Sequence, residues 1–406
     1  MKVIAEKYKM LFITMFCYLF FYTGRHNFGW ATKAMSEDLG ISYSYIGWIS
    51  FSMLIGYSLG QFINGNLADR FNPKYMIPIG AYLSIVCNIG ISFAHSAQLI
   101  LILWFFNGLF QSMAWAPGGK IIINWFDAQE QNKAFGFYTM AAGLSSVVTF
   151  LISIVLTSMD LEWRMLFRIP VLFLLVSATV FLLFIKTSPG QNLNIKDRDK
   201  PLFKELRDSY AQVLNNRLFR RVCLSFGLES MARYGLIFWV PVHFLGEDWK
   251  NNPSFLWVTF LLPLGMGIGA LSFGQLATHV FKNNFSSIAF GMFVCAFISF
   301  SIYVNNSTNI IVIGLLLIAC GFFVYGPQAN FWALCPQIMG KDKTGTAIGV
   351  MNMFGYLCAA VIEPFLGHII EISGNTLILF IIIGCICLLS ALNIISLNQT
   401  REKEKI

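Results

Sequence analysis

Two arginines, Arg25 and Arg233, lie inside stretches that are otherwise strongly apolar. Arg25 falls within residues 10–34, and Arg233 falls within residues 222–245. A guanidinium group stays charged at physiological pH, and placing it in hydrocarbon costs roughly 2.5–3.5 kcal/mol or more. Such a residue is retained where it faces a wet cavity or a partner, and its planar donors fit a carboxylate or phosphate bidentately. The pair therefore predicts a binding site for an anion.

Two acidic residues also lie in apolar stretches. Glu229 precedes Arg233 by four positions, in the order that pairs well on one helix face. It can neutralise the arginine in an empty site and be displaced by an anion. Glu363 directly precedes Pro364, and hydrocarbon disfavours the charged form of its carboxyl group. Glu363 is therefore a candidate proton carrier, with a hydrogen-bonded residue at a helix kink as the alternative.

The elements that carry these residues are predicted by the composition. The chain is 56% hydrophobic and only 12% charged, whereas soluble domains carry about 25% charged residues. This balance predicts a multi-pass membrane protein. Apolar runs near the length that crosses a bilayer core of about 30 Å recur twelve times. They lie near residues 10–32, 44–66, 75–94, 98–122, 134–157, 165–185, 221–245, 254–278, 285–304, 309–333, 345–369 and 375–397.

The distribution of positive charge predicts the orientation in the membrane. Most of the 28 Lys and Arg residues fall in segments that share one side if the N-terminus is cytoplasmic. The positive-inside rule predicts that both termini are cytoplasmic, and the expected location is the cytoplasmic (inner) membrane. The net charge of +8 follows from this bias and requires no nucleic acid. The expected partners are the lipid bilayer and a small anionic solute, and the expected state is a monomer.

The domain organisation follows from one long polar stretch, residues 186–220, which is rich in Lys, Arg, Asp and Asn. It predicts a cytoplasmic linker between a six-helix half at residues 1–185 and a second six-helix half at residues 221–406. The two arginines lie 208 positions apart (233 − 25) in a chain of 406 residues. This offset suggests one arginine from each half of a duplicated protein.

The sequence shows no residue pattern that is typical of an enzyme active site or a metal site. The nine cysteines nearly all fall inside predicted helices, and none has the spacing of a metal site. No pairing of a nucleophile with a base stands out. We therefore expect no catalytic residue, no metal and no cofactor.

The segment between the second and third predicted helices carries a further motif. Gly65 begins a predicted tight turn that contains Asp69 and Arg70 and ends in a trailing base. The matching segment 274–282 keeps the glycine and the base but has Thr278 in place of the acid. This pair resembles the signature of the major facilitator superfamily, in which these residues gate conformational change. A solvated turn is the alternative.

Several longer motifs resemble the organophosphate:phosphate antiporter family, the glycerol-phosphate and hexose-phosphate exchangers of that superfamily. The resemblance runs over most of the chain. It rests on Tyr18 and Tyr22 before Arg25-His26-Asn27-Phe28, on residues 111–120 (QSMAWAPGGK), on Arg233-Tyr234-Gly235, on Tyr325-Gly326-Pro327 and on Phe354-Gly355-Tyr356.

The resemblance implies an all-α membrane fold of twelve transmembrane helices in two pseudo-symmetric halves, working by alternating access. It also implies that Arg25 and Arg233 hold the anionic group and that tyrosines line the same cavity. These are Tyr18, Tyr22, Tyr325 and Tyr356. For each tyrosine, ordinary packing is the alternative. Tyr18 and Tyr22 precede Arg25 by seven and three positions, which places them on its face of a continuous helix.

Some family positions differ here, and the differences bear on the substrate. Gln61 stands where the family often has a site lysine, and Ala142 falls where the glycerol-phosphate type has a histidine. The family's lysine and aspartate in helices 1 and 7 are His26 and Phe238. The site therefore offers fewer cations than a phosphate exchanger, although the preference for an anion remains.

Three functions follow as hypotheses. The leading one is secondary transport of a small organic anion, exchanged in the manner of the organophosphate antiporters. The second is proton-coupled transport of a polycarboxylate, such as a carboxylate siderophore or an organic acid, which the two glutamates motivate. The third is a transporter-like membrane sensor, which would bind its ligand without net flux.

Overall fold

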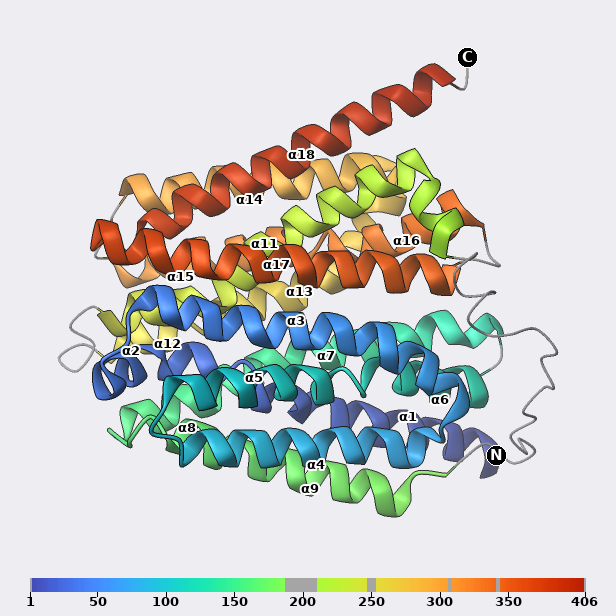
Figure 1. The fold of residues 1–406 in the computed structure, drawn as a ribbon. Coiled ribbons are helices and arrows are strands. Elements are labelled where there is room, and N and C mark those ends of the chain that lie inside the picture. The colour runs from blue at the N-terminus through green and yellow to red at the C-terminus, as the bar shows by residue number, and fades with distance from the viewer. Residues whose placement is uncertain are drawn as a thin grey trace. The chain divides into compact units, whose positions relative to one another are not determined.

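The computed structural model describes residues 2–126, 128–186, 210–246, 253–305, 309–340 and 344–404. Within these ranges the regular elements are helices, and no strand occurs. The chain forms two compact units, Met1–Lys196 (unit 1) and Asp197–Ile406 (unit 2), whose helices are labelled in Figure 1. The all-α prediction is confirmed for the described residues.

Unit 1 begins with a helical segment that is interrupted near its middle and continues with longer helices. In chain order its elements are α1 (Lys2–Phe21), η1 (Tyr22–Gly24), α2 (Phe28–Leu39), α3 (Tyr43–Arg70), α4 (Pro73–Ser92), α5 (Ala97–Gln111), α6 (Trp115–Trp125), α7 (Ala128–Ser158), α8 (Met165–Arg168) and α9 (Pro170–Phe184).

In unit 2 a helical stretch at residues 210–215 precedes the long helix that carries Arg233. In chain order the elements of this unit are α11 (Arg217–Gly246), α12 (Ser254–Val258), α13 (Leu261–Gln275), η2 (Leu276–Phe281), α14 (Asn284–Asn305), α15 (Ile310–Tyr325), α16 (Gln328–Met339), α17 (Thr344–Ser373) and α18 (Ile378–Glu404).

Ten helical segments among the described residues are long and apolar enough to cross a membrane. They coincide with ten of the twelve predicted spans. The other two predicted spans, near 10–32 and 221–245, are also helical but carry the buried arginines. The first is split into α1, η1 and α2, and the second forms part of the unbroken α11.

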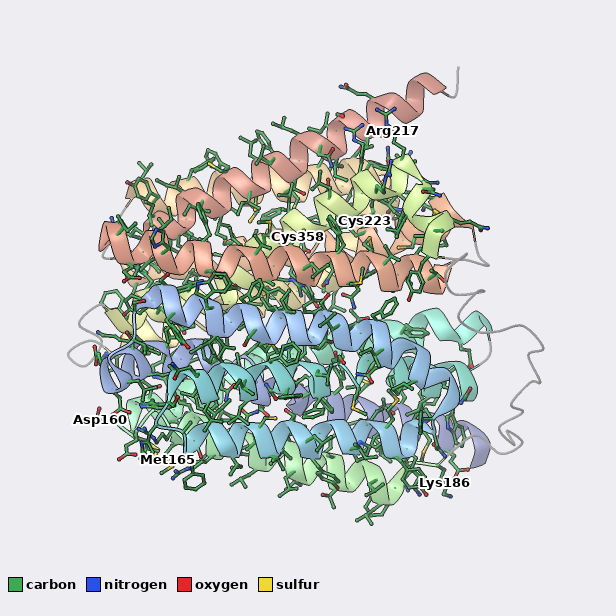
Figure 2. The ribbon with its side chains drawn as sticks, in the orientation of Figure 1. Asp160, Met165, Lys186, Arg217, Cys223 and Cys358 are labelled. Atoms are coloured by element: carbon green, nitrogen blue, oxygen red, sulfur yellow. The ribbon has the colours of Figure 1, made fainter. Side chains whose placement is uncertain are left out.

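Two ion pairs lie at one end of unit 1. The Nζ atom of Lys7 lies 2.6 Å from Glu130, and that of Lys186 lies 2.7 Å from Glu6. These pairs join the start of α1 to the start of α7 and to the chain that follows α9. Figure 2 shows Asp160 and Met165 at one end of the unit and Lys186 at the other. The segment from α8 through α9 therefore runs the length of the unit.

The same packing device recurs in both units. In unit 1, a Cβ atom at Gly56 would collide with the backbone of Phe105, so α3 and α5 approach closely. In unit 2, α13 and α15 approach in the same way, where Gly265 faces the backbone of Ile318. Small residues that let helix backbones come together are typical of membrane helix interfaces. These contacts hold α3 against α5 in unit 1 and α13 against α15 in unit 2.

The prediction of a turn that begins at Gly65 is wrong. α3 continues through Arg70, and the Phe71 amide still donates to the carbonyl of Leu67 at 2.8 Å. The chain turns only at Asn72, because the following Pro73 disfavours a helical conformation at the residue before it. Asn72 has an extended backbone, and its side chain caps α4 by accepting from the Lys74 amide.

The predicted linker lies largely outside the described residues, which leave out 187–209. Where the description resumes, residues 210–215 are helical, and α11 then begins at Arg217. The long helix that carries Arg233 therefore begins four residues before the predicted position 221.

Candidate functional site

Arg25 lies at a break in the first membrane segment of unit 1. α1 ends at Phe21, a 3₁₀ turn follows, and α2 begins only at Phe28. The Arg25 backbone itself is not helical (φ −140°, ψ −51°). The prediction of a continuous helix through residues 10–32 is therefore wrong at its centre. Arg25 is nevertheless fully buried, with 0% of its surface exposed.

Two tyrosine rings flank the Arg25 guanidinium. Its central carbon lies 3.9 Å from the ring centre of Tyr22 and 4.9 Å from that of Tyr57, which comes from α3. A cation near an aromatic ring within about 6 Å is stabilised by the ring's quadrupole. The planar donor edges of the guanidinium can still bind a ligand while its flat surface lies near the rings.

Tyr18 lies in an aromatic cluster next to this arginine. Its ring centre lies 5.8 Å from that of Tyr22, 4.9 Å from that of Tyr138 on α7 and 5.5 Å from that of Trp115 on α6. Trp115 and Tyr138 stack on each other at 4.9 Å. Tyr18 and Tyr22 therefore belong to one aromatic group with residues of two other helices, α6 and α7.

Gln61 lies one turn after Tyr57 on α3 and is half-buried. Its Nε2 atom is buried and makes no hydrogen bond with the part of the chain that the structure describes. A buried donor in this state costs free energy unless a ligand or water accepts from it. This agrees with a position facing a solute.

Arg233 of unit 2 lies on the continuous α11, one turn after Glu229. The Nε atom of Arg233 and the Oε1 atom of Glu229 are 3.6 Å apart, which is an ion pair beyond hydrogen-bond distance. The other carboxylate oxygen accepts from the hydroxyl group of Ser230 at 3.2 Å. Glu229 is 0% exposed and Arg233 is 6% exposed. The pair is thus buried but loosely joined.

Tyrosines also surround Arg233. Its guanidinium carbon lies 4.5 Å from the ring centre of Tyr234 and 5.3 Å from that of Tyr325, at the end of α15. Tyr356 of α17 does not stand over the arginine but packs against Tyr234, with ring centres 5.4 Å apart. Arg233, Tyr325 and Tyr356 are thus linked through Tyr234.

Glu363 lies in the middle of α17, which runs without interruption through Pro364. The carboxyl group is fully buried, and its Oε2 atom accepts a 2.9 Å hydrogen bond from the indole Nε1 of Trp239 on α11. Its Oε1 atom has no hydrogen-bond partner among the described residues. The carboxyl group therefore keeps one open position for a proton or a ligand.

The three residues with a predicted gating role, Gly65, Asp69 and Arg70, lie in the last turns of α3. Their side chains lie outside the part of the structure that is described. Their role stays a prediction.

Sequence reasoning missed Tyr57 and Tyr234. Tyr57 precedes Gln61 by four positions and so shares its helix face, which was an available signal. Tyr234 directly follows Arg233, and helical neighbours point about 100° apart, so the spacing predicted no contact. The Tyr57 contact depends on how α3 packs beside Arg25, and the Tyr234 contact depends on the path of the Arg233 side chain.

The chain shows similarity to known proteins over most of its length. A sequence profile of the Major Facilitator Superfamily matches residues 14–362. The glycerol-3-phosphate transporter of Bacillus subtilis (strain 168) is 25% identical over 404 residues, which cover 93% of this chain and 91% of that protein. The phosphoglycerate transporter protein of Salmonella typhimurium is 24% identical over 415 residues, with 95% and 89% covered.

A solved structure agrees in fold. The crystal structure of a D-xylose-proton symporter superposes with a TM-score of 0.76 at 15% sequence identity, covering 95% of this chain and 97% of that one. At this identity the similarity concerns the fold alone.

Proposed function

This chain belongs to the Major Facilitator Superfamily, and on that premise we propose that it carries a small organic anion across a cytoplasmic membrane. As a member of a transporter family it is a multi-pass membrane protein and not an enzyme. In the proposed function Arg25 and Arg233 bind the anionic group of the solute. Similar proteins named as transporters of glycerol 3-phosphate and phosphoglycerate support a phosphorylated or related anion.

The observation that carries the proposal is the burial of Arg25 at the break in its helix. Irregular backbone inside a membrane is tolerated where it is buried in protein or lines a cavity, and broken helices mark the substrate sites of many secondary transporters. A charged side chain at such a position is by default a functional residue. In the proposed site Tyr18, Tyr22 and Gln61 of unit 1 also line the binding position.

The proposed arrangement in the membrane has twelve spans, in halves 1–185 and 221–406, joined by the linker 186–220. The ten apolar helices, together with the helical segments that carry the two arginines, support this count. Both termini are placed in the cytoplasm on the distribution of Lys and Arg. The transporter acts as a monomer, and Gly65, Asp69 and Arg70 gate its conformational change.

Transport in proteoliposomes tests this function. With the full chain reconstituted, inorganic phosphate trapped inside should stimulate the uptake of labelled glycerol 3-phosphate. Arg25→Lys keeps the charge but loses the planar fork, so uptake should fall by about 10–100-fold. Arg168→Lys, an arginine near the end of unit 1 that donates to Ser92, is the matched control. Ligand binding without flux would indicate a sensor instead.

A second candidate is proton-coupled transport of a polycarboxylate, for which the open oxygen of the buried Glu363 is the supporting observation. In unit 2 Glu229 then pairs with Arg233 until an anion replaces it, and Tyr325 and Tyr356 complete the binding position. A pH gradient should stimulate citrate uptake in the native protein. Glu363→Gln should abolish that stimulation, whereas Trp239→Phe, which removes the donor to the carboxyl group and keeps an aromatic ring, should retain it. Equal loss in both variants would rule out proton transfer at Glu363.

A further inference from the structure

The break that carries Arg25 has no proline to cause it. Residues 21–28 read Phe-Tyr-Thr-Gly-Arg-His-Asn-Phe, and Gly24 is the weakest helix former among them. A broken helix leaves carbonyl groups without their helical donors, and in a membrane these groups must find partners within the protein. The cause of the break therefore has to come from the helices that pack around it.

We propose that four side chains form an amide clamp that holds this break in place and thereby positions Arg25. They come from two helices and are Ser84 and Asn88 on α4, and Asn107 and Gln111 on α5. The proposal rests on the proposed function, because it assigns the clamp a role in anion binding through Arg25. The four are positioning residues and do not themselves contact the solute.

The clamp supplies the donors that the broken helix lacks. The Nδ2 atoms of Asn107 and Asn88 donate to the carbonyl of Gly24 at 2.9 Å and 3.1 Å. The Nε2 atom of Gln111 donates to the carbonyl of Phe21 at 2.9 Å. The amide of Phe28 donates to the carbonyl of Arg25 and not to that of Gly24, so side-chain amides take the place of the helical donor at Gly24. At Phe21, the Gln111 amide adds a donor next to the 3₁₀ turn.

Hydrogen bonds within the clamp hold these donors in position. The hydroxyl group of Ser84 donates to Oδ1 of Asn107 at 2.6 Å and accepts from Gln111 at 2.8 Å. Asn88 donates to the same Oδ1 atom of Asn107 at 3.2 Å. All four side chains are at least 98% buried. Because the clamp side chains are buried and hydrogen-bonded to one another, none of them can move away from the break without losing further hydrogen bonds.

Gly24 fits this arrangement because it has no side chain. A Cβ atom at position 24 would lie 3.0 Å from Nε2 of Gln111, 3.1 Å from Oγ of Ser84 and 3.3 Å from Nδ2 of Asn88. These distances are tighter than ordinary contacts. Glycine therefore lets the three side chains approach the backbone from one side.

The far side of the break is attached through Asn27. The Nδ2 atom of Asn27 donates to the carbonyl of Leu166 on α8 at 2.8 Å and to Oδ1 of Asn88 at 3.3 Å. Arg25 lies between this attachment and the clamped carbonyl of Gly24. Its direction toward Tyr22 and Tyr57 is thus set by hydrogen bonds on both sides of it.

Unit 2 offers a matched control. Asn330 of α16 is also buried, and its Nδ2 atom donates to Oγ of Ser287 at 2.9 Å and to the carbonyl of Phe273 at 3.4 Å. It joins α16 to α13 and α14 but does not contact α11, which carries Arg233, through these bonds. Asn330→Leu therefore removes a buried amide of the same kind without touching an arginine-bearing segment.

The test measures binding of inorganic phosphate and of glycerol 3-phosphate to the purified full chain by ligand-dependent thermal shift. Asn107→Leu should weaken binding about tenfold, the effect of about one lost buried hydrogen bond on the arginine's position. Asn330→Leu should leave the affinity within about twofold of the native value, even if it lowers the melting temperature as much as Asn107→Leu does. Gln111→Leu should behave like Asn107→Leu.

The decisive comparison places Asn107→Leu in the Arg25→Lys background. If the clamp acts through Arg25, it should weaken binding no further there, since effects on one interaction are not additive. A full tenfold loss in that background, or no loss in the native one, would overturn the clamp's role. If Arg25→Lys alone leaves binding unchanged, or neither ligand stabilises the native protein, the proposed function fails instead.

Hydrogen–deuterium exchange gives a readout that needs no ligand. Peptides covering residues 18–30 should exchange faster in Asn107→Leu and Gln111→Leu, because the break loses its donors. They should be unchanged in Asn330→Leu. Unchanged exchange in the two clamp variants would show that the break is held by something else and would overturn the proposal regardless of binding.

Discussion

Arg25 lies at a break in its helix, whereas Arg233 lies on an unbroken helix with an acid one turn earlier. Both guanidinium groups are buried beside two tyrosine rings. In unit 1 the helix itself is interrupted to place the cation, and in unit 2 a neighbouring carboxylate balances it. The two units thus accommodate a buried arginine in different ways.

The two units also differ in the charged side chains that they bury. Among the described residues, the buried Asp, Glu, Lys and Arg side chains are Arg25 in unit 1 and Glu229, Arg233 and Glu363 in unit 2. Unit 1 therefore presents a positive site, and unit 2 presents a site of mixed sign. Under the proposed function, an anion gains attraction from unit 1 and must compete with Glu229 in unit 2.

The largest effects on ligand affinity are expected for substitutions of the two arginines, and the two should differ in size. Arg25→Lys should weaken binding of glycerol 3-phosphate by about 100-fold, and Arg233→Lys by about tenfold, because Glu229 already offsets part of the Arg233 charge. The two dissociation constants are measured side by side by thermal-shift titration, with Arg168→Lys as the control. Equal losses would mean that the two sites do not differ in the proposed way.

A smaller effect of the opposite sign is expected at Glu229. Glu229→Gln removes the competing charge and keeps the size of the side chain, so anion affinity should rise by about three- to tenfold. Ser230→Ala, which removes only the hydroxyl donor to that carboxylate, serves as the control and should change affinity little. Weaker binding in Glu229→Gln would show that the acid orients Arg233 rather than competing for it.

The tyrosine rings should contribute less than the charges. Tyr57→Leu removes a ring beside Arg25 and should weaken binding about fivefold, whereas Tyr57→Phe keeps the ring and should have a smaller effect. Tyr325→Leu is the equivalent change beside Arg233. If Tyr57→Phe is as damaging as Tyr57→Leu, the hydroxyl group and not the ring is what the site uses.

The smallest effect is expected at the end of unit 1 that contains Asp38. Hydrogen bonds from Arg164 at 2.8 Å and Trp163 at 3.2 Å lower the pKa of the Asp38 carboxyl group. A lowered folded-state pKa stabilises the protein above the unfolded-state value, and this stabilisation is lost as the pH falls through the folded-state value. Asp38→Asn should therefore melt about one degree lower at neutral pH.

Melting curves of Asp38→Asn and the native protein, recorded from pH 7 to acid, check this expectation. The difference between them should shrink as the pH falls, and Glu37→Gln, at an exposed neighbour, should show no such convergence. A difference that stays constant with pH would assign the effect to packing.

Much of the fold was predictable because hydrophobic length and charge bias are local properties. The apolar runs located ten helices that the structure contains. Two predictions were wrong, each for a different reason. The turn expected at Gly65 moved to Asn72 because Asn-Pro ends a helix more strongly than a glycine does. The break beside Arg25 escaped detection because its donors, Asn88 and Asn107, lie 64 and 83 positions beyond Gly24.

The membrane class, the two arginines in apolar segments and the acid on the same face as Arg233 could all be predicted from the sequence. They follow from side-chain chemistry and helical spacing, which need no tertiary information. Tertiary packing was needed to reveal that the first helix breaks at Arg25, that Tyr57 lies beside that arginine, and that Trp239 donates to Glu363. Each of these depends on hydrogen bonds or ring contacts between helices distant in the chain, and those are formed only when the helices pack.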